Sequence, residues 1–238
     1  MFSLFKKKRA IGEVKHPDVA VKKTLETIKS IEFSPEHIVD IGGNQGGWSR
    51  VALSVFPEAK ISLFEPQSRL SQYLEDLERN PNVKIHYKGV GNFDGKLPFT
   101  FHDRDDSCSF VYEAEDAKAR GFDRKDIEIC RLDTAMAGNP FGVPSIVKID
   151  AEGLDLQVLE GGSETLRTSE LVFVEASVAN KDYPNTVVAV VNKMDTLGYR
   201  LFDITDLNRT PQRKFLWLLE MVFVRKGSKI DKAATKFD

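Results

Sequence analysis

The sequence has little cysteine and no long apolar run, and its charges are nearly balanced. Its 238 residues include 2 cysteines, and 34 basic side chains stand against 36 acidic ones, for a formal net charge of −2. Without a basic excess no overall field attracts a polyanion, so we expect no nucleic-acid partner. No apolar run reaches the roughly 18 residues of a membrane span, and none follows the basic start as a secretory signal requires. We therefore expect a cytoplasmic protein.

Metal-binding and disulfide patterns are also missing. Cys108 and Cys130 lack metal-ligand spacing, and a reducing compartment disfavours a disulfide, so both are interpreted as free structural thiols. Asp103, Asp105 and Asp106 could attract a divalent cation, but an acidic loop without histidine partners is usually solvated. We predict no metal.

The composition supports one sizeable hydrophobic core, since 41% of the residues are hydrophobic and 16 are Phe. We expect a basic flexible tail over 1–17, a single domain over 18–226 in which 91–143 is an insertion over the site, and a frayed tail over 227–238. Residues 1–9 combine apolar and basic side chains and could make weak peripheral contact with an anionic membrane, although a solvated tail is favoured. The oligomeric state is not indicated.

Short apolar runs alternate with segments of helical periodicity along most of the chain. This order predicts an α/β fold, a Rossmann-like, doubly wound, seven-stranded sheet that is mostly parallel with an antiparallel final strand. The expected core strands lie at 37–43, 60–66, 83–91, 145–153, 170–177, 199–206 and 215–225, and the expected helices at 18–31, 48–56, 67–80, 155–167 and 185–199.

The strongest local motif is the segment from Asp40 to Gly47, DIGGNQGG, where the first strand turns into its helix. Gly42 and Gly46 let the backbone turn sharply and let a ligand approach main-chain N–H groups at the helix start. The carboxylate of Asp40, at the end of the strand, can accept hydrogen bonds from a cation. The motif predicts a nucleotide-type site.

Glu65 ends the second strand in LFEP, 25 residues after Asp40. A carboxylate at this place can accept both hydroxyls of a ribose, as in other doubly wound nucleotide binders. The alternative is that the glycines serve only a tight turn and Glu65 caps the helix expected from Gln67. The matched spacing favours the ligand site.

The identity of the ligand depends on Asn44 and Asp40. A nicotinamide cofactor needs glycine at three set positions, and Asn44 stands where the second would be. Asp40 would repel a pyrophosphate and attract the ammonium of a methionine moiety. We therefore expect S-adenosylmethionine as the cofactor.

The segment KIDAEG, from Lys148 to Gly153, ends the fourth strand, at the crevice of an open sheet. Asp150 and Glu152 could act as a base for methyl transfer to a hydroxyl, or they could only hold Lys148 and cap the next helix; both interpretations remain open. Glu175, on the same rim, is a further candidate for substrate contact. His102 could be the base instead, although packing is the commoner role of such a histidine.

These motifs together resemble the FkbM family of methyltransferases. The matching segments, in order, are VDIGGNQGGWS, LFEP, the loop with Ser107 and Ser109, RLD, IVKIDAEGLDLQVLEGG and LVFVEAS. The resemblance runs from about Ile38 to Ser177. Gly43 departs from the small alanine that the family pattern would have.

The resemblance implies the class I methyltransferase fold and O-methylation, commonly of sugar or polyketide hydroxyls. It implies that Asp40, Gly42, Asn44, Gly46 and Glu65 line the cofactor site, and that Asp150 and Glu152 lie near the transferred methyl group. Two other classes stay open: a catalytically silent interaction protein that keeps the cofactor fold and, less favoured, a nicotinamide-dependent oxidoreductase.

Overall fold

A computed structural model describes residues 19–102, 108–112, 114–179 and 184–234. The expected tail over 1–17, the membrane contact through residues 1–9 and the acidic residues Asp103, Asp105 and Asp106 lie outside the described residues. Among the helices that are described, none is long and apolar enough to cross a membrane.

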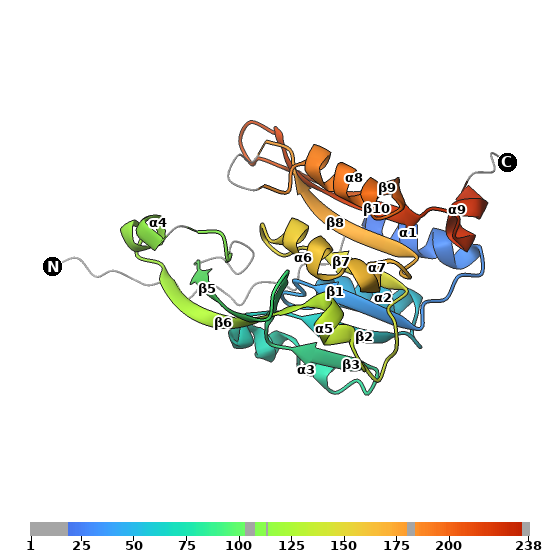
Figure 1. Cartoon of the computed structure of the whole chain (residues 1–238), viewed down its shortest axis with the longest axis horizontal. Helices are drawn as coiled ribbons and strands as arrows, with labels where there is room; N and C mark the ends of the chain where they lie inside the picture. The colour runs from blue at the N-terminus through green and yellow to red at the C-terminus, as the bar shows by residue number, and fades with distance from the viewer. Residues whose placement is uncertain (1–18, 103–107, 113, 180–183, 235–238) are drawn as a thin grey trace.

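A seven-stranded sheet forms the centre of the molecule (Figure 1), with strand order β3-β2-β1-β7-β8-β10-β9. β10 runs antiparallel to both of its neighbours, and the pairs from β3 to β8 are parallel. The predicted fold class is confirmed. The strands are β1 (His37–Ile41), β2 (Lys60–Phe64), β3 (Val83–His86), β7 (Ile146–Ile149), β8 (Leu171–Ser177), β9 (Tyr199–Arg209) and β10 (Leu216–Arg225).

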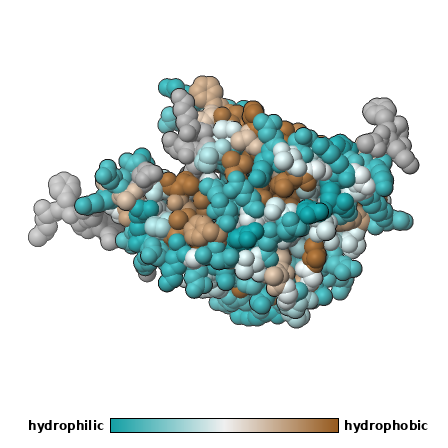
Figure 2. Space-filling model, viewed as in Figure 1, coloured by the Kyte–Doolittle hydropathy of each residue, from teal (hydrophilic) through white to brown (hydrophobic). Residues whose placement is uncertain are grey.

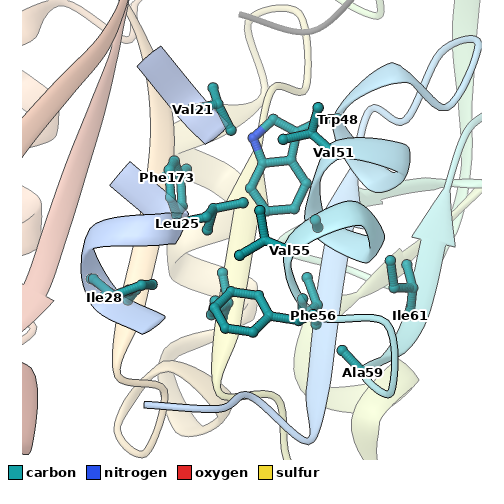
Figure 3. Packing of buried hydrophobic residues seen from close by; sticks show 14 of the residues in the cluster. Val21, Leu25, Ile28, Trp48, Val51, Val55, Phe56, Ala59, Ile61 and Phe173 are labelled. Carbon is teal, nitrogen blue, oxygen red and sulfur yellow. The ribbon is translucent and has the colours of Figure 1, made fainter. Parts of the chain in front are cut away.

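The inner strands are buried on both faces, which is why they are short apolar runs. Alternate residues enter two separate cores: Ile38 and Leu171 belong to one, Val39 and Val172 to the other. α1 (Val19–Ser30) and α2 (Gly47–Val55) cover the first core, where Trp48 meets Phe173 edge to face at 5.2 Å (Figure 3). The second core is covered by α5 (Leu132–Met136), α6 (Asp155–Gly161), α7 (Ser163–Leu166) and α8 (Val187–Thr196).

Residues 91–143 contribute most of a second, three-stranded sheet of order β4-β6-β5, which extends to the left of the main sheet in Figure 1. The strand expected over 83–91 is divided between the two sheets: β3 joins the main sheet, and β4 pairs with β6. The elements of this region are β4 (Gly89–Gly91), β5 (Gly95–Phe101), α4 (Ala114–Ala119) and β6 (Asp123–Arg131).

Two expected helices are broken. The segment 67–80 forms the 3₁₀ helix η1 (Ser68–Tyr73) and the single turn α3 (Glu75–Glu78), and 155–167 divides at Gly162 into α6 and α7. At Gly161 an added Cβ would lie 2.0 Å from the carbonyl oxygen of Gly91. The backbone of β4 therefore passes too close to α6 for any side chain there.

The expectation of a frayed tail from 227 is wrong for the described part of that segment. Residues 229–234 form α9 (Lys229–Ala234), in which Ile230 is fully buried. The Lys229 ammonium donates to the carbonyl of Glu32 at 2.9 Å, and Arg200 pairs with Asp231. α9 thus packs beside the end of α1. Residues 235–238 lie outside the described part.

The face shown in Figure 2 is mostly hydrophilic, with hydrophobic residues in small separate areas. Cys108 and Cys130 are buried thiols, and neither forms a disulfide within the described residues.

Candidate functional site

The turn between β1 and α2 lies at the carboxyl edge of the sheet. Gly42 and Gly46 have φ angles of 75° and 77°, and Asn44 between them has a φ of 46°. The N–H groups of Gly42 and Gly43 both donate to the carbonyl of Phe64, at 2.9 and 3.0 Å. The turn is therefore held against the end of β2.

Gly42 also lies against the end of β7, where an added Cβ would be 1.8 Å from the carbonyl oxygen of Asp150. At Gly46 an added Cβ would meet the side chains of Leu77 and Leu74, at 2.5 and 2.8 Å. Each glycine thus permits a close approach to a neighbouring element, in addition to the left-handed backbone.

Glu65 joins the turn to the segment after β2. Its two carboxylate oxygens accept hydrogen bonds from the backbone N–H groups of Asn44 and Gln67, each at 2.8 Å. The side chain is nearly buried. Burial raises the pKa of Glu65, and these two N–H donors oppose the rise. Glu65 and the glycine turn, predicted separately from the sequence, therefore belong to one hydrogen-bonded unit.

Asp40 lies behind the turn and has no exposed surface. One of its oxygens accepts from the Ser49 hydroxyl at 2.6 Å, and the other lies 3.5 Å from the Lys148 ammonium. These contacts favour a role in holding the turn. The expected attraction to a ligand ammonium stays a prediction.

Lys148 connects β1 with β7 from a buried position beneath the turn. Its ammonium donates to the carbonyls of Ile41 and Gly42 and to Asp150, at 3.2, 2.9 and 3.2 Å. Burial lowers the pKa of Lys148, but the nearby carboxylates, Asp150 foremost, outweigh burial and raise it. Lys148 stays charged and neutralises part of an acidic site.

Glu175 is brought to the same edge by β8 and is half-buried. Burial first, and then the charges of Asp150, Glu152 and Asp155, raise the pKa of its carboxyl. Its Oε2 atom is buried without a hydrogen-bond partner among the described residues. The structure thus places Glu175 with Asp150, as the sequence led us to expect.

Glu220, on β10, is a member of this site that the sequence analysis missed. It is the Cα partner of Glu175 across the antiparallel pair and is 9% exposed. The Thr205 hydroxyl donates to its Oε1 atom at 2.5 Å. Burial raises the pKa of Glu220 to about 7. The available signal was a lone carboxylate inside the apolar run FLWLLEMVFVR, since buried carboxylates with perturbed pKa values gather at functional sites.

Asp155 and Asn185 were also missed, and both are fully buried. Asp155 accepts from the N–H groups of Ala151 and Gly153 at 3.0 and 3.2 Å, and from the Asn185 side chain at 2.8 Å. Burial raises the pKa of Asp155 to about 6. Asp155 therefore shapes the turn that carries Glu152.

Glu152 itself has a φ of 48°, and its carbonyl accepts from the Ser109 hydroxyl at 2.7 Å. The second sheet, through Ser109, is thereby fixed to the rim of the main one. His102 packs instead against Phe122, with ring centroids 4.5 Å apart. Within the described ranges no group of three or more potential metal ligands occurs.

A family model described as the methyltransferase FkbM domain matches residues 40–201. This range spans the glycine turn, Glu65, the second sheet and the rim from Asp150 to Glu175. Of the site residues described above, Glu220 of β10 and its partner Thr205 of β9 lie outside this range.

Two curated relatives are methyltransferases. The chain is 22% identical over 190 residues to the 2-O-methyltransferase NoeI of Sinorhizobium fredii (strain NBRC 101917 / NGR234), covering 74% of this chain and 78% of that protein. It is 29% identical over 156 residues to the methyltransferase sdnD of Sordaria araneosa, covering 53% of this chain and 60% of that protein.

Among solved structures, the chain resembles the methyltransferase FkbM from Methylobacillus flagellatus KT, with a TM-score of 0.52 and 14% identity. The alignment covers 78% of this chain but 43% of the other, so the chain spans less than half of that protein's length. This likeness shows the fold.

Proposed function

This chain belongs to the FkbM methyltransferase family, and on that premise we propose that it transfers a methyl group from S-adenosylmethionine to a hydroxyl of a saccharide or another small molecule. The observation that carries the proposal is the unit formed by the glycine turn and Glu65 at the carboxyl edge of β1 and β2. This edge is where open α/β sheets bind nucleotides.

The residues present fit a cationic nucleoside. A carboxylate offers about four lone-pair sites, so Glu65 can still accept hydroxyl donors beside its two backbone N–H bonds. Among the described residues, Glu175 carries a buried oxygen without a hydrogen-bond partner, and the rim holds more carboxyls than the Lys148 ammonium can neutralise. Such a site suits a positively charged ligand and repels a pyrophosphate, which disfavours a nicotinamide cofactor.

Within the proposal, Gly42, Asn44, Gly46 and Glu65 would hold the cofactor, and Asp40 would keep the turn in place. When bound, the cofactor supplies an electrophilic methyl carbon on a positively charged sulfur. Asp150, Glu152 and Glu175, on the adjoining rim, are the groups available to orient a hydroxyl and to take its proton.

The choice of a hydroxyl acceptor is supported by the relative named as a 2-O-methyltransferase. A proton must leave an oxygen as it is methylated, and carboxyls gathered at the rim can receive it. Nucleic acid is not favoured as the acceptor, because the same acidic rim would repel phosphates.

Calorimetric titration with S-adenosylmethionine, S-adenosylhomocysteine and NAD tests the cofactor. We expect the first two to bind and NAD to give no heat. Glu65→Gln should weaken both by roughly 10- to 100-fold, since it replaces a charged acceptor of hydrogen bonds with a neutral one.

The matched control is Glu58→Gln, an exposed carboxyl after α2, which should bind as the wild type does. Both variants should melt as cooperatively as the wild type. If the folded wild-type protein binds neither sulfur compound, the chemistry is absent and the interaction-protein alternative leads. Tight NAD binding would instead favour an oxidoreductase.

A further inference from the structure

Three carboxyls stand in a row on neighbouring strands at the crevice. Ile149 pairs with Val174, so Asp150 and Glu175 follow side by side, and Glu175 is in turn the Cα partner of Glu220. Residues in register on adjacent strands face the same side of a sheet.

That side is the one covered by α1 and α2. On β8, Leu171 and Phe173 share it with Glu175, and on β10, Val222 and Val224 share it with Glu220. Directly opposed residues of an antiparallel pair have Cβ atoms about 5 Å apart. The Cβ atoms of Glu175 and Glu220 are therefore close neighbours, with Glu175 half-buried and Glu220 buried.

The groups around this pair do not neutralise it. Glu175 is faced by Asp150 at the end of β7, by Glu152 in the following turn and by Asp155 at the start of α6. Glu220 is faced by Asp150 and by Asp206 of β9. Among the described residues, Lys148 of β7 acts on both carboxyls as a cation.

Lys148 is already held by Asp150 and by two backbone carbonyls. Two buried like charges this close cannot both ionise without a large cost. Burial raises the pKa of both carboxyls, that of Glu220 to about 7.

We propose that Glu175 and Glu220 share one proton and together accept the proton of the hydroxyl that is methylated, with Glu175 nearer the acceptor and Glu220 as a positioning residue behind it. This inference rests on the proposed function. It assigns a role to a residue of β10, outside the segment matched by the family model.

Asp150 differs from the pair because its carboxylate is already engaged: one of its oxygens lies 3.2 Å from the Lys148 ammonium. Glu175 has an oxygen without a partner among the described residues, and Glu220 is fixed from behind by the Thr205 hydroxyl. A proton taken up at Glu175 can therefore be shared with Glu220 while the ion pair of Lys148 with Asp150 stays in place.

The proton and electron balance is simple. The acceptor's O–H bond breaks and its proton goes to the carboxyl pair, while the acceptor oxygen forms a bond to the methyl carbon of the sulfonium donor. The electrons of the C–S bond return to sulfur, which becomes a neutral thioether. The positively charged sulfonium favours the ionised form of the carboxyl pair. When methyl transfer turns the sulfonium into a neutral thioether, the pair becomes more basic, at the moment when the hydroxyl proton is released.

Carbon-13 NMR of the protein labelled at the glutamate carboxyl carbon tests the shared proton without any ligand. In the wild type, Glu175 should titrate well above the usual range of glutamate. In Glu220→Gln the pKa of Glu175 should fall by about 1 unit or more, as coupled carboxyls require.

Two further variants complete the NMR test. Thr205→Val should raise the pKa of Glu220, because the hydroxyl hydrogen bond holds it down. Glu128→Gln, an exposed carboxyl of β6, should leave both unchanged. The inference is overturned if both carboxyls titrate in the usual range, or if the pKa of Glu175 is the same in wild type and Glu220→Gln.

Calorimetry in buffers of different ionisation enthalpy tests the link to the sulfur's charge. S-adenosylmethionine and S-adenosylhomocysteine carry the same amino acid group, so the difference between their proton counts isolates that charge. At neutral pH the sulfonium should release up to about 1 more proton than the thioether, and Glu220→Gln should abolish the difference.

Equal proton counts for the two ligands would overturn the inference and leave the proposed function standing. Binding of neither ligand would overturn the proposed function and, with it, the role of the pair in methyl transfer, even where NMR shows a shared proton.

Discussion

At the scale of single residues, Gly42 decides whether β1 and β7 can meet at the site. Its φ of 75° is left-handed, and the space where a Cβ would lie is taken by the carbonyl oxygen of Asp150. The sequence indicated the first of these properties, because glycine after a buried strand favours a sharp turn. The second depends on a residue more than a hundred positions away.

Gly42→Ala should destabilise the fold by about 3 kcal/mol or more, because a left-handed backbone costs roughly 1 to 2 kcal/mol and the overlap with the Asp150 carbonyl forces a shift of the backbone. Gly138→Ala is the matched control, with a φ of 70° and nothing within 4 Å of the added Cβ. It should lose only about 1 to 2 kcal/mol. Urea unfolding followed by circular dichroism measures both, and equal losses would contradict the role of the close approach.

At the scale of elements, β3 ends in a histidine that stacks on the end of β2. His86 lies 4.5 Å from the Phe64 ring at an interplanar angle of 13°, and its Nε2 atom has no hydrogen-bond partner among the described residues. Burial first, and then the charges of Lys84 and Lys88, lower the pKa of His86 to about 4, from an ordinary value of 6.5. The native state therefore prefers the neutral ring.

Because the folded pKa is the lower one, the stability from His86 is complete above pH 6.5 and is lost as the pH falls toward about 4. His86→Phe keeps the stack and removes the titration. The variant should thus gain stability relative to the wild type as the pH falls through this window, with a constant difference above it. Urea unfolding at about pH 7.5 and about pH 4.5 checks this, and a difference that does not vary with pH would refute it.

Two segments form other elements than their local sequence patterns predict. The periodicity of 67–80 predicted one helix, but the chain forms η1 and the short α3, because Leu74 and Leu77 turn inward against the β1–α2 turn. The run 83–91 predicted one strand, but Gly89 to Gly91 pair with β6 in the second sheet. In both cases the partner, which comes from elsewhere in the chain, outweighs the local preference.

At the scale of the whole molecule, the last described helix closes the fold against the first. Ile230 of α9 is fully buried in the core that α1 and α2 cover. The composition of the segment, rich in lysine, serine and alanine, indicated a frayed end. The buried Ile230, the pair of Arg200 with Asp231 and the hydrogen bond from Lys229 to the Glu32 carbonyl hold it in place.

Ile230→Ala should lower the free energy of unfolding by roughly 2 kcal/mol or more, the usual cost of emptying a buried isoleucine site. Ala234→Ser, at an exposed position of the same helix, should change it by less than about 0.5 kcal/mol. Thermal unfolding by calorimetry compares the two. A loss as small as that of the control would mean that α9 does not contribute to the core.

The sequence by itself determined the alternation of strands and helices in the main sheet, and it indicated the glycine turn, Glu65 and the rim residues Asp150, Glu152 and Glu175 as the candidate site. These follow from local rules, because burial on two faces requires apolar runs and the ends of parallel strands meet at one edge. The tertiary structure decided which side chains complete the site: Glu220, Asp155 and Asn185 enter it through strand register and buried hydrogen bonds. Register joins residues far apart in the chain, and no spacing along the sequence records which of them will face each other.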